Sequence, residues 1–571
     1  MRLPRSALRN ARDADWVVVD PGRARGSAAR VREVLGALGS ADADAGAMVL
    51  HHALPDDFPP VVLAELARAD ADLPARGRAA REDLRALAFL TLDPANARDH
   101  DDAVCVEPLS GGGARLHVAI ADVSARVAEG SALDREALRR GNSVYFPDRA
   151  IPMLPHALSG DLCSLRPGVD RATLVVILDL DSRGGVRGRR FARALIRSRA
   201  RLSYDEGAAV IDPDHAARDA RPPDAPEIVE QLRRLADVAT RLMERRFEAG
   251  SIDFDLPTAE IVLGDEGHPV DVIEAPRTLA HRAIEEAMLA ANRAVAEALD
   301  EAGIPLLHRV HEAPSAEDLA GLEELLRSFG LLGRSAAPLD SRAIAAAVTR
   351  AVGRPEERLV NLATLRSMRQ ARYAETNLGH FALGFEHYAH FTSPIRRYAD
   401  LVVHRALIDG LLGDAASRDR ALERGEGLPR VAARVSARER LAVDAERDMI
   451  AVKKCVFMQP HVGEVHDGTV EGVARHGLYV TLDPFFVEGL VHVSRLPKGL
   501  VFDEHRHALR ARRGEAGYRL GDRVRVRVDS IDAARGWISY SLAGRNGRPR
   551  EAQDGAWSSA SSSAAIRSQS R

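Results

Sequence analysis

The sequence predicts a multidomain α+β protein, and three observations support this. The chain has 571 residues and is 46% hydrophobic, which is enough to bury a large core in more than one domain. Its first part contains short apolar runs of strand length, and a long helical pattern extends from Val431 to Phe457. Residues 462–542 instead contain short alternating strands with glycine-rich turns. We therefore expect a mixed domain followed by a separate β module.

Four aspartates lie within ten residues, at Asp93, Asp99, Asp101 and Asp102. Apolar runs precede and follow them, and Asp93-Pro94 interrupts the first run, so we expect a loop between two strands. Carboxylates this close raise one another's pKa unless a cation lies between them. The cluster therefore predicts a divalent-metal site.

Mg²⁺ is the metal that these ligands favour, because it takes few carboxylates and completes its shell with water and phosphate oxygens. Two alternatives stay open. A solvated acidic loop would carry the same residues. A calcium loop fits less well, since it needs Gly and Glu at its sixth and twelfth positions, and counting from Asp93 gives Arg98 and Val104.

An arginine-rich segment leads to Tyr204. Alternation along a strand would place several of these side chains on one face, where they could follow a phosphate backbone. A solvated strand is the alternative. The formal net charge is only −3, so any positive potential that attracts nucleic acid must be local. The segment contains Arg187, Arg189, Arg190, Arg193, Arg197, Arg199 and Arg201.

The segment Thr392–Tyr398 predicts a helix start. Ser393 is a good N-cap and Pro394 suits the first helical position. Free N–H groups at that end, together with Arg396 and Arg397, would form an anion site suited to a phosphodiester. An ordinary capped helix whose arginines pair with surface acids is the alternative.

The string Asp-Pro-Ala-Asn-Ala-Arg-Asp-His-Asp-Asp-Ala-Val at residues 93–104 resembles the metal-binding sequence of the ribonuclease II and ribonuclease R family. Further strings follow in the order of that family and together cover about residues 80–460. One such string could arise by chance, but seven in register could not. They lie at residues 116–124, 141–147, 151–155, 162–165, 250–257, 308–312 and 391–398.

The resemblance implies an exoribonuclease that hydrolyses single-stranded RNA processively from the 3′ end and releases 5′-nucleoside monophosphates. It also implies two Mg²⁺ ions, one of which arrives with the RNA. Asp93 and Asp102 would bind the first ion. Asp99 and Asp101 would serve the second and orient the attacking water. A metal held by carboxylates activates water and offsets the developing negative charge.

Arg396 matches the arginine that approaches the scissile phosphate, with Arg397 as a less certain RNA contact. Glu446, on the predicted long helix, corresponds to a glutamate near the active site of the family. Glu439, two turns earlier on the same helical face, is the rival, and a solvated charged helix is the general alternative.

Two tyrosines are candidates for RNA contacts, in a chain with only 4% aromatic residues. Tyr145 matches a tyrosine at the 3′ end of the RNA near the metal, and Tyr204 matches one that contacts a base further up the channel. Stacking of a base on a ring contributes about 1–3 kcal/mol and tolerates any sequence. Core packing is the alternative for both.

The family organisation implies four regions: a partial cold-shock or OB-like region and linker at 1–78, an RNB-type catalytic domain at 79–457, an S1-type OB-fold barrel at 458–545, and a disordered tail at 546–571. The catalytic domain would have a mixed sheet with surrounding helices. Phe485, His492 and Arg525 are the RNA-binding candidates of the barrel. The stretches Trp16–Asp20 and Ala29–Gly36 would be the last strands of the N-terminal region.

Composition favours a cytoplasmic protein with no membrane contact. No stretch of eighteen apolar residues occurs, and the N-terminus has no apolar signal core. Cys105, Cys163 and Cys455 lie far apart without a CxxC pair, so we expect reduced thiols.

Our hypothesis is a magnesium-dependent 3′–5′ exoribonuclease. A catalytically inactive RNA-binding regulator with the same domains is the alternative, and the presence of all four aspartates argues against it. Activity on structured RNA, the limit product, the target transcripts, the oligomeric state and contacts with ribosomes or decay machinery stay open, as does the reason for the short N-terminal region.

Overall fold

A computed structural model describes residues 8–20, 29–68, 79–215, 217, 219–253, 258–264, 267–333, 339–354, 356–503, 508–511 and 517–543. The chain divides into two compact units, Met1–Gln459 with Asp532–Gly536, and Pro460–Ile531 with Trp537–Arg571. The tail predicted at 546–571 lies outside the described residues.

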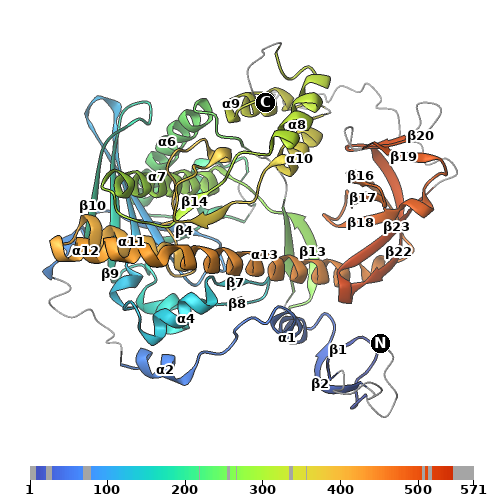
Figure 1. The fold of residues 1–571 in the computed structure, drawn as a ribbon, viewed down its shortest axis with the longest axis horizontal. Helices are drawn as coiled ribbons and strands as arrows, with labels where there is room; N and C mark the ends of the chain where they lie inside the picture. Colours follow the sequence, from blue (N-terminus) through green and yellow to red (C-terminus); the bar gives the residue numbers. More distant parts are fainter. Residues whose placement is uncertain are drawn as a thin grey trace, which may run out of the picture. The chain divides into compact units, whose positions relative to one another are not determined.

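The larger unit contains a seven-stranded mixed sheet, as the sequence predicts for the catalytic domain; strands β4, β9 and β10 of it are labelled in Figure 1. The strand order is β11-β4-β5-β6-β9-β10-β3, with β11 parallel to β4 and β3 parallel to β10. Leu116 and Ala119 of β6 point to opposite faces and are both 0% exposed, so both faces are covered. The strands are β3 Glu82–Asp83, β4 Leu90–Asp93, β5 Asp102–Pro108, β6 Ala114–Ala121, β9 Asp170–Leu180, β10 Val186–Arg197 and β11 Ala200–Ser203.

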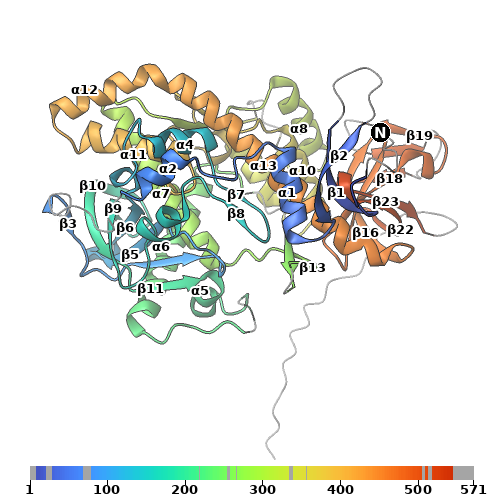
Figure 2. The ribbon, with the colours of Figure 1, turned by 90° about the horizontal axis from the view of Figure 1, so that it is seen from below.

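Helices α5 (Tyr204–Ile211), α6 (Pro226–Glu248) and α7 (Leu279–Glu301) pack around the sheet, and α6 and α7 contact β5 and β6 (Figure 2). Local sequence explains where the first two begin. Ser203 and Glu206 form a capping box for α5, and Pro226 occupies the first turn of α6.

The long helix predicted at 431–457 is α13 (Leu428–Met458), which begins three residues earlier because Pro429 suits its first turn. Helices α8 to α10 have a small core of their own, which includes Leu326, Ile344 and Val360. The other helices are α4 Ala132–Arg140, α8 Ala316–Ser328, α9 Ser341–Ala351, α10 Glu357–Ser367, α11 Tyr398–Leu411 and α12 Ala415–Glu423.

Short elements complete this unit. A π-helical turn, η4, covers Ala157–Leu162, and 3₁₀ turns cover Ser110–Gly112, Val123–Ala125, Phe381–Leu383, Arg424–Gly427 and Ala533–Arg535. A further 3₁₀ turn, Gln459–His461, spans the point in the sequence where the first unit ends and the second begins. Three two-stranded sheets pair β7 Val144–Tyr145 with β8 Ala150–Ile151, β12 Ala259–Leu263 with β13 Pro269–Glu274, and β14 His308–Val310 with β15 Arg372–Ala374.

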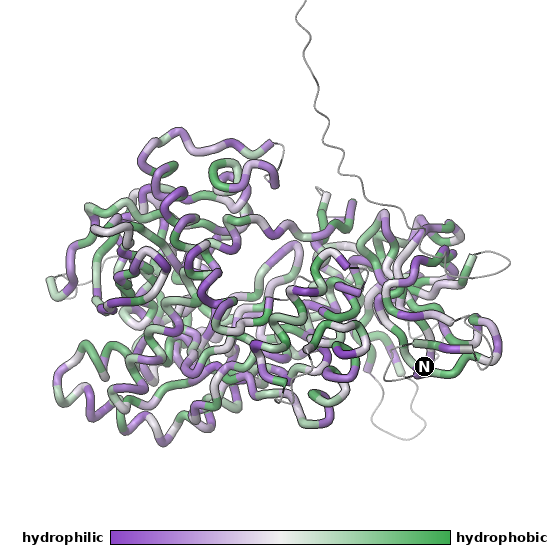
Figure 3. The backbone as a smooth tube through the Cα atoms, turned by 90° about the horizontal axis from the view of Figure 1, so that it is seen from above, coloured by the Kyte–Doolittle hydropathy of each residue, from purple (hydrophilic) through white to green (hydrophobic). Residues whose placement is uncertain are grey.

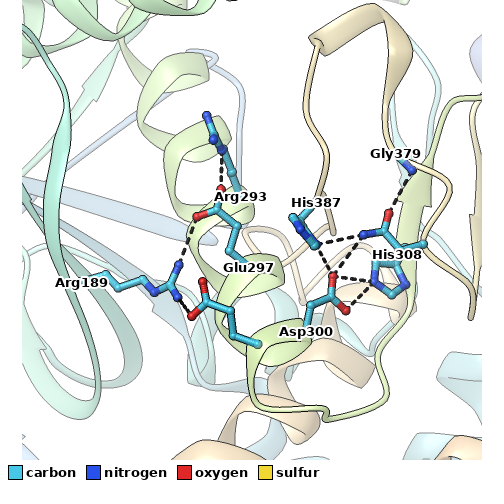
Figure 4. Close-up of polar contacts among 9 residues, drawn as sticks. Arg189, Arg293, Glu297, Asp300, His308, Gly379 and His387 are labelled. Atoms are coloured by element: carbon cyan, nitrogen blue, oxygen red, sulfur yellow. Dashed lines mark hydrogen bonds and ion pairs between the residues drawn. The ribbon is translucent and has the colours of Figure 1, made fainter.

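Polar contacts join α7 to its neighbours on two sides (Figure 4). Arg189 of β10 donates to Glu297 of α7 at 3.1 Å. On the other side, Asp300 Oδ1 lies 3.0 Å from His308 Nε2 of β14, and Asp300 Oδ2 lies 2.5 Å from His387 Nδ1. The carboxylates of α7 thus attach the helix both to the sheet and to the segment that leads to Phe391.

The N-terminal strand predictions are confirmed. β1 (Asp15–Asp20) pairs antiparallel with β2 (Arg30–Ala37), and together they form a two-stranded sheet followed by α1 (Ala41–His51) and α2 (Pro60–Leu66). Asp44 of α1 accepts a hydrogen bond from the Trp16 indole of β1 at 2.8 Å. It also forms an ion pair with Lys453 of α13 at 2.7 Å. Both partners of this ion pair are 0% exposed, so it fixes α1 against α13.

The smaller unit contains a closed five-stranded barrel in the order β16-β17-β18-β23-β22, as predicted for an OB fold. Its interior includes Val470, Val480, Val491, Val526 and Tyr540, each 0% exposed. The barrel strands are β16 Val465–Ala474, β17 Gly477–Leu482, β18 Glu488–His492, β22 Arg523–Asp532 and β23 Trp537–Leu542; a 3₁₀ turn covers Val493–Arg495, and a three-stranded sheet contains β19 Leu500–Asp503, β20 Ala508–Ala511 and β21 Gly517–Arg519.

Hydrophobic and hydrophilic residues are interspersed along the backbone, without a long uniformly hydrophobic segment (Figure 3). Within the described residues, no helix combines the length and the apolar character that a membrane span requires. Cys105, Cys163 and Cys455 are buried free thiols, as predicted.

Candidate active site

The aspartate cluster lies where β4 and β5 meet. Asp93 is the last residue of β4 and Asp102 the first of β5, so these two occupy strand ends and only Asp99 and Asp101 lie in the connecting loop. The two strands are antiparallel neighbours, with Leu90 opposite Val104. The adjacent ends of β4 and β5 bring Asp93 and Asp102, nine positions apart in the sequence, to the same end of the two strands.

The loop carboxylates are held by groups from distant parts of the chain. Asp101 is 4% exposed, and its Oδ1 accepts a hydrogen bond from the Ile395 N–H at 2.8 Å. Arg396 Nε lies 3.6 Å from Asp101 Oδ2. The hydroxyl of Tyr145 donates to Asp99 Oδ2 at 3.0 Å. These contacts bring three predicted site residues, Tyr145, Asp99 and Arg396, to one place.

The electrostatics of the cluster suit a bound cation. Burial, and next the charge of Asp93, raise the pKa of Asp102 to about 8. Burial also raises the pKa of Asp101 well above its ordinary value, although Arg396 opposes this. Asp102 Oδ2 is buried with no hydrogen-bond partner among the described residues. An unsatisfied buried oxygen costs about 1–3 kcal/mol, and a cation would remove this cost.

The four aspartates do not form a closed cage. In the described part of the chain, no three of them bring one oxygen each within 4.8 Å of one another. His100 Nδ1 also lies 2.7 Å from Asp93 Oδ2, so one potential ligand already has a partner. This open arrangement fits Mg²⁺, which keeps several waters and binds through one or two carboxylates plus phosphate oxygens.

The helix start predicted at Ser393-Pro394 is wrong. Helix α11 begins at Tyr398, and residues 394–396 form a turn. The reason is a long-range pairing: the Ser143 N–H donates to the Arg396 carbonyl at 3.0 Å, and the Tyr398 N–H donates to the Gly141 carbonyl at 2.9 Å. This pairing holds Arg397 extended, at φ −133°, and postpones the helix. The turn instead presents the Ile395 N–H to Asp101.

The two neighbouring arginines differ in their partners. Arg396 has a 44% exposed side chain and lies beside Asp101. Arg397 donates to both oxygens of the fully buried Asp400, at 2.7 and 2.8 Å. Its guanidinium is therefore already neutralised. A direct contact of Arg397 with RNA stays a prediction, and the pairing with Asp400 indicates that this arginine also holds the start of α11.

The structure places Glu446, and not Glu439, next to the cluster. The Tyr145 N–H donates to Glu446 Oε1 at 2.7 Å, and burial raises the pKa of this carboxyl. Glu439 lies seven residues, or nearly two turns, earlier on α13 and accepts a hydrogen bond from Arg309 at 2.6 Å. Tyr145 therefore connects two site residues: its hydroxyl binds Asp99, and its backbone N–H binds Glu446.

Comparison with known proteins agrees with this geometry. The RNB domain matches residues 81–413, and the S1 RNA binding domain matches residues 459–543. Ribonuclease R of Aquifex aeolicus is 40% identical over 490 residues, which cover 86% of this chain and 68% of that protein. The chain belongs to the ribonuclease R family. Ribonucleases with an RNB domain generally depend on a divalent metal.

Solved structures support the family at the level of the fold. Ribonuclease R of Mycoplasma genitalium, in complex with ribose-methylated single-stranded RNA, matches with a TM-score of 0.82 and 27% identity over 90% of this chain and 80% of that chain. A yeast pseudonuclease matches with a TM-score of 0.65 and 20% identity over 88% of this chain and 63% of that chain. The second match concerns the fold alone.

Tyr204 is the first residue of α5. It directly follows Ser203, the last residue of β11, which pairs with Asp93 of β4. The ring stacks on His281 of α7, with centroids 3.9 Å apart. Sequence reasoning missed His281, whose Nδ1 accepts from the Thr278 N–H at 3.2 Å. The only local signal was its position in the first turn of a helix, which does not reveal a ring partner from another element.

The arginine-rich segment forms β10 and β11 and favours the solvated alternative over the phosphate track. Most of its side chains pair with acids of the same unit: Arg187 with Asp181, Arg189 with Glu297, Arg190 with Glu82, Arg193 with Asp122 and Arg197 with Asp170. Arg201 differs, because it donates to the carbonyl of Ala95 at 2.8 Å in the aspartate loop. Together with a second donation to the Ala97 carbonyl at 3.2 Å, this contact stabilises the loop.

The candidate RNA residues of the barrel lie within the smaller unit. His492 ends β18 and is exposed. Arg525 is exposed on β22, where it alternates with buried Val524 and Val526, and its Nε lies 3.4 Å from Asp467. Phe485 is half-buried between β17 and β18, against the rings of two histidines. These residues are candidates for separate contacts with a nucleic acid.

Proposed function

We propose that this chain is a hydrolytic 3′–5′ exoribonuclease that degrades single-stranded RNA to 5′-nucleoside monophosphates and depends on Mg²⁺. The observation that supports it most is the buried Asp102 oxygen without a partner, beside the buried Asp101 and the half-exposed Arg396. A buried carboxylate oxygen without a partner destabilises a metal-free fold, so its presence fits a site that binds a cation.

Asp93 and Asp102 would hold one ion, and Asp99 and Asp101 would serve a second that arrives with the RNA phosphate. When bound, the metal supplies an activated water and positive charge for the phosphodiester oxygens. The residues of the chain do the rest. Asp101 is fixed by the Ile395 N–H, so its other oxygen can orient the water. Arg396 can donate to the phosphate as negative charge develops.

Tyr145 and Glu446 would position the nucleotide that leaves. Tyr145 is 39% exposed, so it can contact the terminal base or sugar, and the hydrogen bonds of its backbone N–H and its hydroxyl fix its orientation. Tyr204, supported by His281, would contact a base further along. Stacking of this kind is tolerant of sequence, which suits a non-specific degrader.

A labelled single-stranded RNA incubated with Mg²⁺ or with EDTA tests the proposal. We expect mononucleotides only with Mg²⁺, and protection when the 3′ end, but not the 5′ end, is chemically blocked. Tight binding with intact RNA under both conditions would instead identify the inactive RNA-binding regulator. Because a pseudonuclease shares the fold, this assay decides what the fold alone does not.

A further inference from the structure

A histidine-containing group on the barrel has no role in the proposed hydrolysis. His461, Glu464 and His466 bring three donor atoms within 4.8 Å of one another, one of two such groups among the described residues. All three residues belong to the smaller unit. The group therefore depends on the folding of the barrel alone.

Local backbone geometry creates the group. His461 and Glu464 are the ends of a tight turn, closed by a hydrogen bond from the Glu464 N–H to the His461 carbonyl at 3.1 Å. Gly463 supplies the φ of +95° that such a turn requires at its third position. The Gly463 N–H donates to the Val528 carbonyl of β22 at 2.8 Å, and the Val528 N–H donates back to Glu464 at 3.0 Å. The turn is thus fastened to β22 of the barrel by two hydrogen bonds.

The side chains converge on a single oxygen. Glu464 Oε2 lies 2.8 Å from His461 Nδ1 and 3.1 Å from His466 Nε2. Ligands about 2.0–2.1 Å from a tetrahedral ion are separated by a little more than 3 Å, so only a small expansion would admit one. The side chains of His461, Glu464 and His466 are 25%, 51% and 15% exposed, which leaves the group accessible.

The groups around the two imidazoles restrict their orientation and would not repel a bound cation strongly. The Phe485 ring lies 4.7 Å from the His461 ring and 5.4 Å from the His466 ring. Arg527 and Arg525 flank Val526, the strand partner of His466, and their guanidinium groups pair with Asp529 at 2.9 Å and Asp467 at 3.4 Å. The hydrogen bond with His461 lowers the pKa of Glu464, so this carboxylate is ionised at neutral pH.

We propose that His461, Glu464 and His466 form a binding site for a transition-metal ion of the Zn²⁺ class, separate from the aspartate site. Two imidazoles and one carboxylate are ligands that Zn²⁺, Co²⁺ and Ni²⁺ prefer, whereas Mg²⁺ selects oxygen ligands. Three protein ligands leave a fourth position for water or an RNA group. A bound ion would fix both imidazoles against Phe485, a candidate RNA contact.

The test uses the full chain, stripped with a chelator and then kept in excess Mg²⁺ to fill the aspartate site. Co²⁺ is titrated while visible absorption is recorded, because tetrahedral Co²⁺ with imidazole ligands absorbs much more strongly than octahedral Co²⁺ with oxygen ligands. We expect one strongly absorbing Co²⁺ per chain, displaced by one Zn²⁺. Absence of that spectrum in the parent protein would overturn the proposal.

Matched variants locate the ion. His461→Ala with His466→Ala should abolish the strong absorption, and Glu464→Gln, which keeps the shape of the side chain, should weaken Co²⁺ binding more than about tenfold. His476→Ala, on the same barrel and bonded to Tyr479, should bind as the parent does. Thermal melting of Glu464→Gln verifies folding. An unchanged Glu464→Gln titration contradicts the site.

The second histidine-containing group, His51, His52 and Asp448, provides the remaining control. His52 Nε2 lies 3.1 Å from Asp448 Oδ2 in the larger unit. Asp448→Ala should leave the Co²⁺ spectrum unchanged. Loss of the spectrum in this variant alone would place the ion there and overturn the assignment to the barrel. Exonuclease assays with Mg²⁺ alone keep this outcome distinct from failure of the proposed hydrolysis.

Discussion

Asp101 combines burial with two fixed contacts, the Ile395 N–H and Arg396, and this combination indicates a role in turnover and not in RNA affinity. We expect Asp101→Asn to bind RNA as the parent does and to lose at least about a hundredfold in turnover, the magnitude for removal of one preorganised electrostatic group. Single-turnover degradation and filter binding measure the two quantities. Asp318→Asn, exposed on α8, is the matched control. Equal turnover of Asp101→Asn and parent would refute the role.

Asp102 makes the stability of the protein depend on pH and metal. Its folded pKa of about 8 lies above the value of about 3.9 for an unfolded aspartate. The metal-free folded state therefore holds more protons between these values and loses stability as the pH rises from about 4 to about 8. We expect Mg²⁺ to raise the melting temperature more at about pH 8 than at about pH 5. In Asp102→Asn this gain should be smaller, and the difference between its values at about pH 8 and about pH 5 should be reduced, while the raised pKa of Asp101 maintains part of the pH dependence. Equal gains at both pH values in the parent protein contradict the argument.

Helix α1 is fixed to α13 by the buried pair of Asp44 and Lys453. Removal of one partner leaves a buried charge unpaired, which costs about 3–5 kcal/mol. We expect Asp44→Ala to loosen α1 and the β1–β2 sheet by this amount, seen as faster amide hydrogen exchange of these elements. Asp42→Ala on the same helix removes an ion pair with Arg149. Because the Asp42 side chain is 90% exposed, this substitution should lower the stability by less than about 1 kcal/mol. Similar exchange in the two variants would contradict the difference in burial.

The barrel depends on close packing at Gly489 of β18. A Cβ there would lie 2.4 Å from the ring of the buried Tyr540. We expect Gly489→Ala to destabilise the barrel by about 1–3 kcal/mol, the usual cost of overpacking. Gly427→Ala, where a Cβ would meet nothing within 4 Å, is the control. Chemical denaturation with a probe on the barrel should separate the two, and matching midpoints would show that Tyr540 can move aside.

At the scale of the whole molecule, a net charge of −3 means that RNA affinity must come from local positive groups. If Arg525 and Arg527 contact phosphates, their joint replacement by Ala should reduce the slope of log affinity against log salt by about 1.4, or 0.7 for each contact with a single strand. Binding titrations at several salt concentrations measure this slope. Arg187 and Arg190 lie in the larger unit, outside the barrel, and pair there with Asp181 and Glu82, so their replacement should leave the slope unchanged. A slope change in that second pair would restore the phosphate track suggested by the sequence.

The match between sequence and structure depends on whether a feature is local. The strands on either side of the aspartates, the long helix and the barrel strands were predictable, because hydrophobic period and glycine-rich turns encode them. The proximity of Tyr145, Asp99 and Arg396 followed from family resemblance and not from spacing. The start of α11 was mispredicted because residues 141–143 pair with 396–398, and no local signal at Ser393 reveals that partner. The pairing of Arg397 with Asp400 and the stack of His281 on Tyr204 were missed for the same reason.

Helix α13 carries Glu439, Glu446 and Lys453 at intervals of seven residues, and they contact Arg309, Tyr145 and Asp44 in turn. Seven residues make nearly two full turns, so the three side chains lie in one row, about 10 Å apart. Insertion or deletion of a single residue between them would rotate everything downstream by about 100°. The spacing of these three contacts along α13 therefore has to be constant. We expect related sequences to contain insertions before Leu428 far more often than within the helix Leu428–Met458.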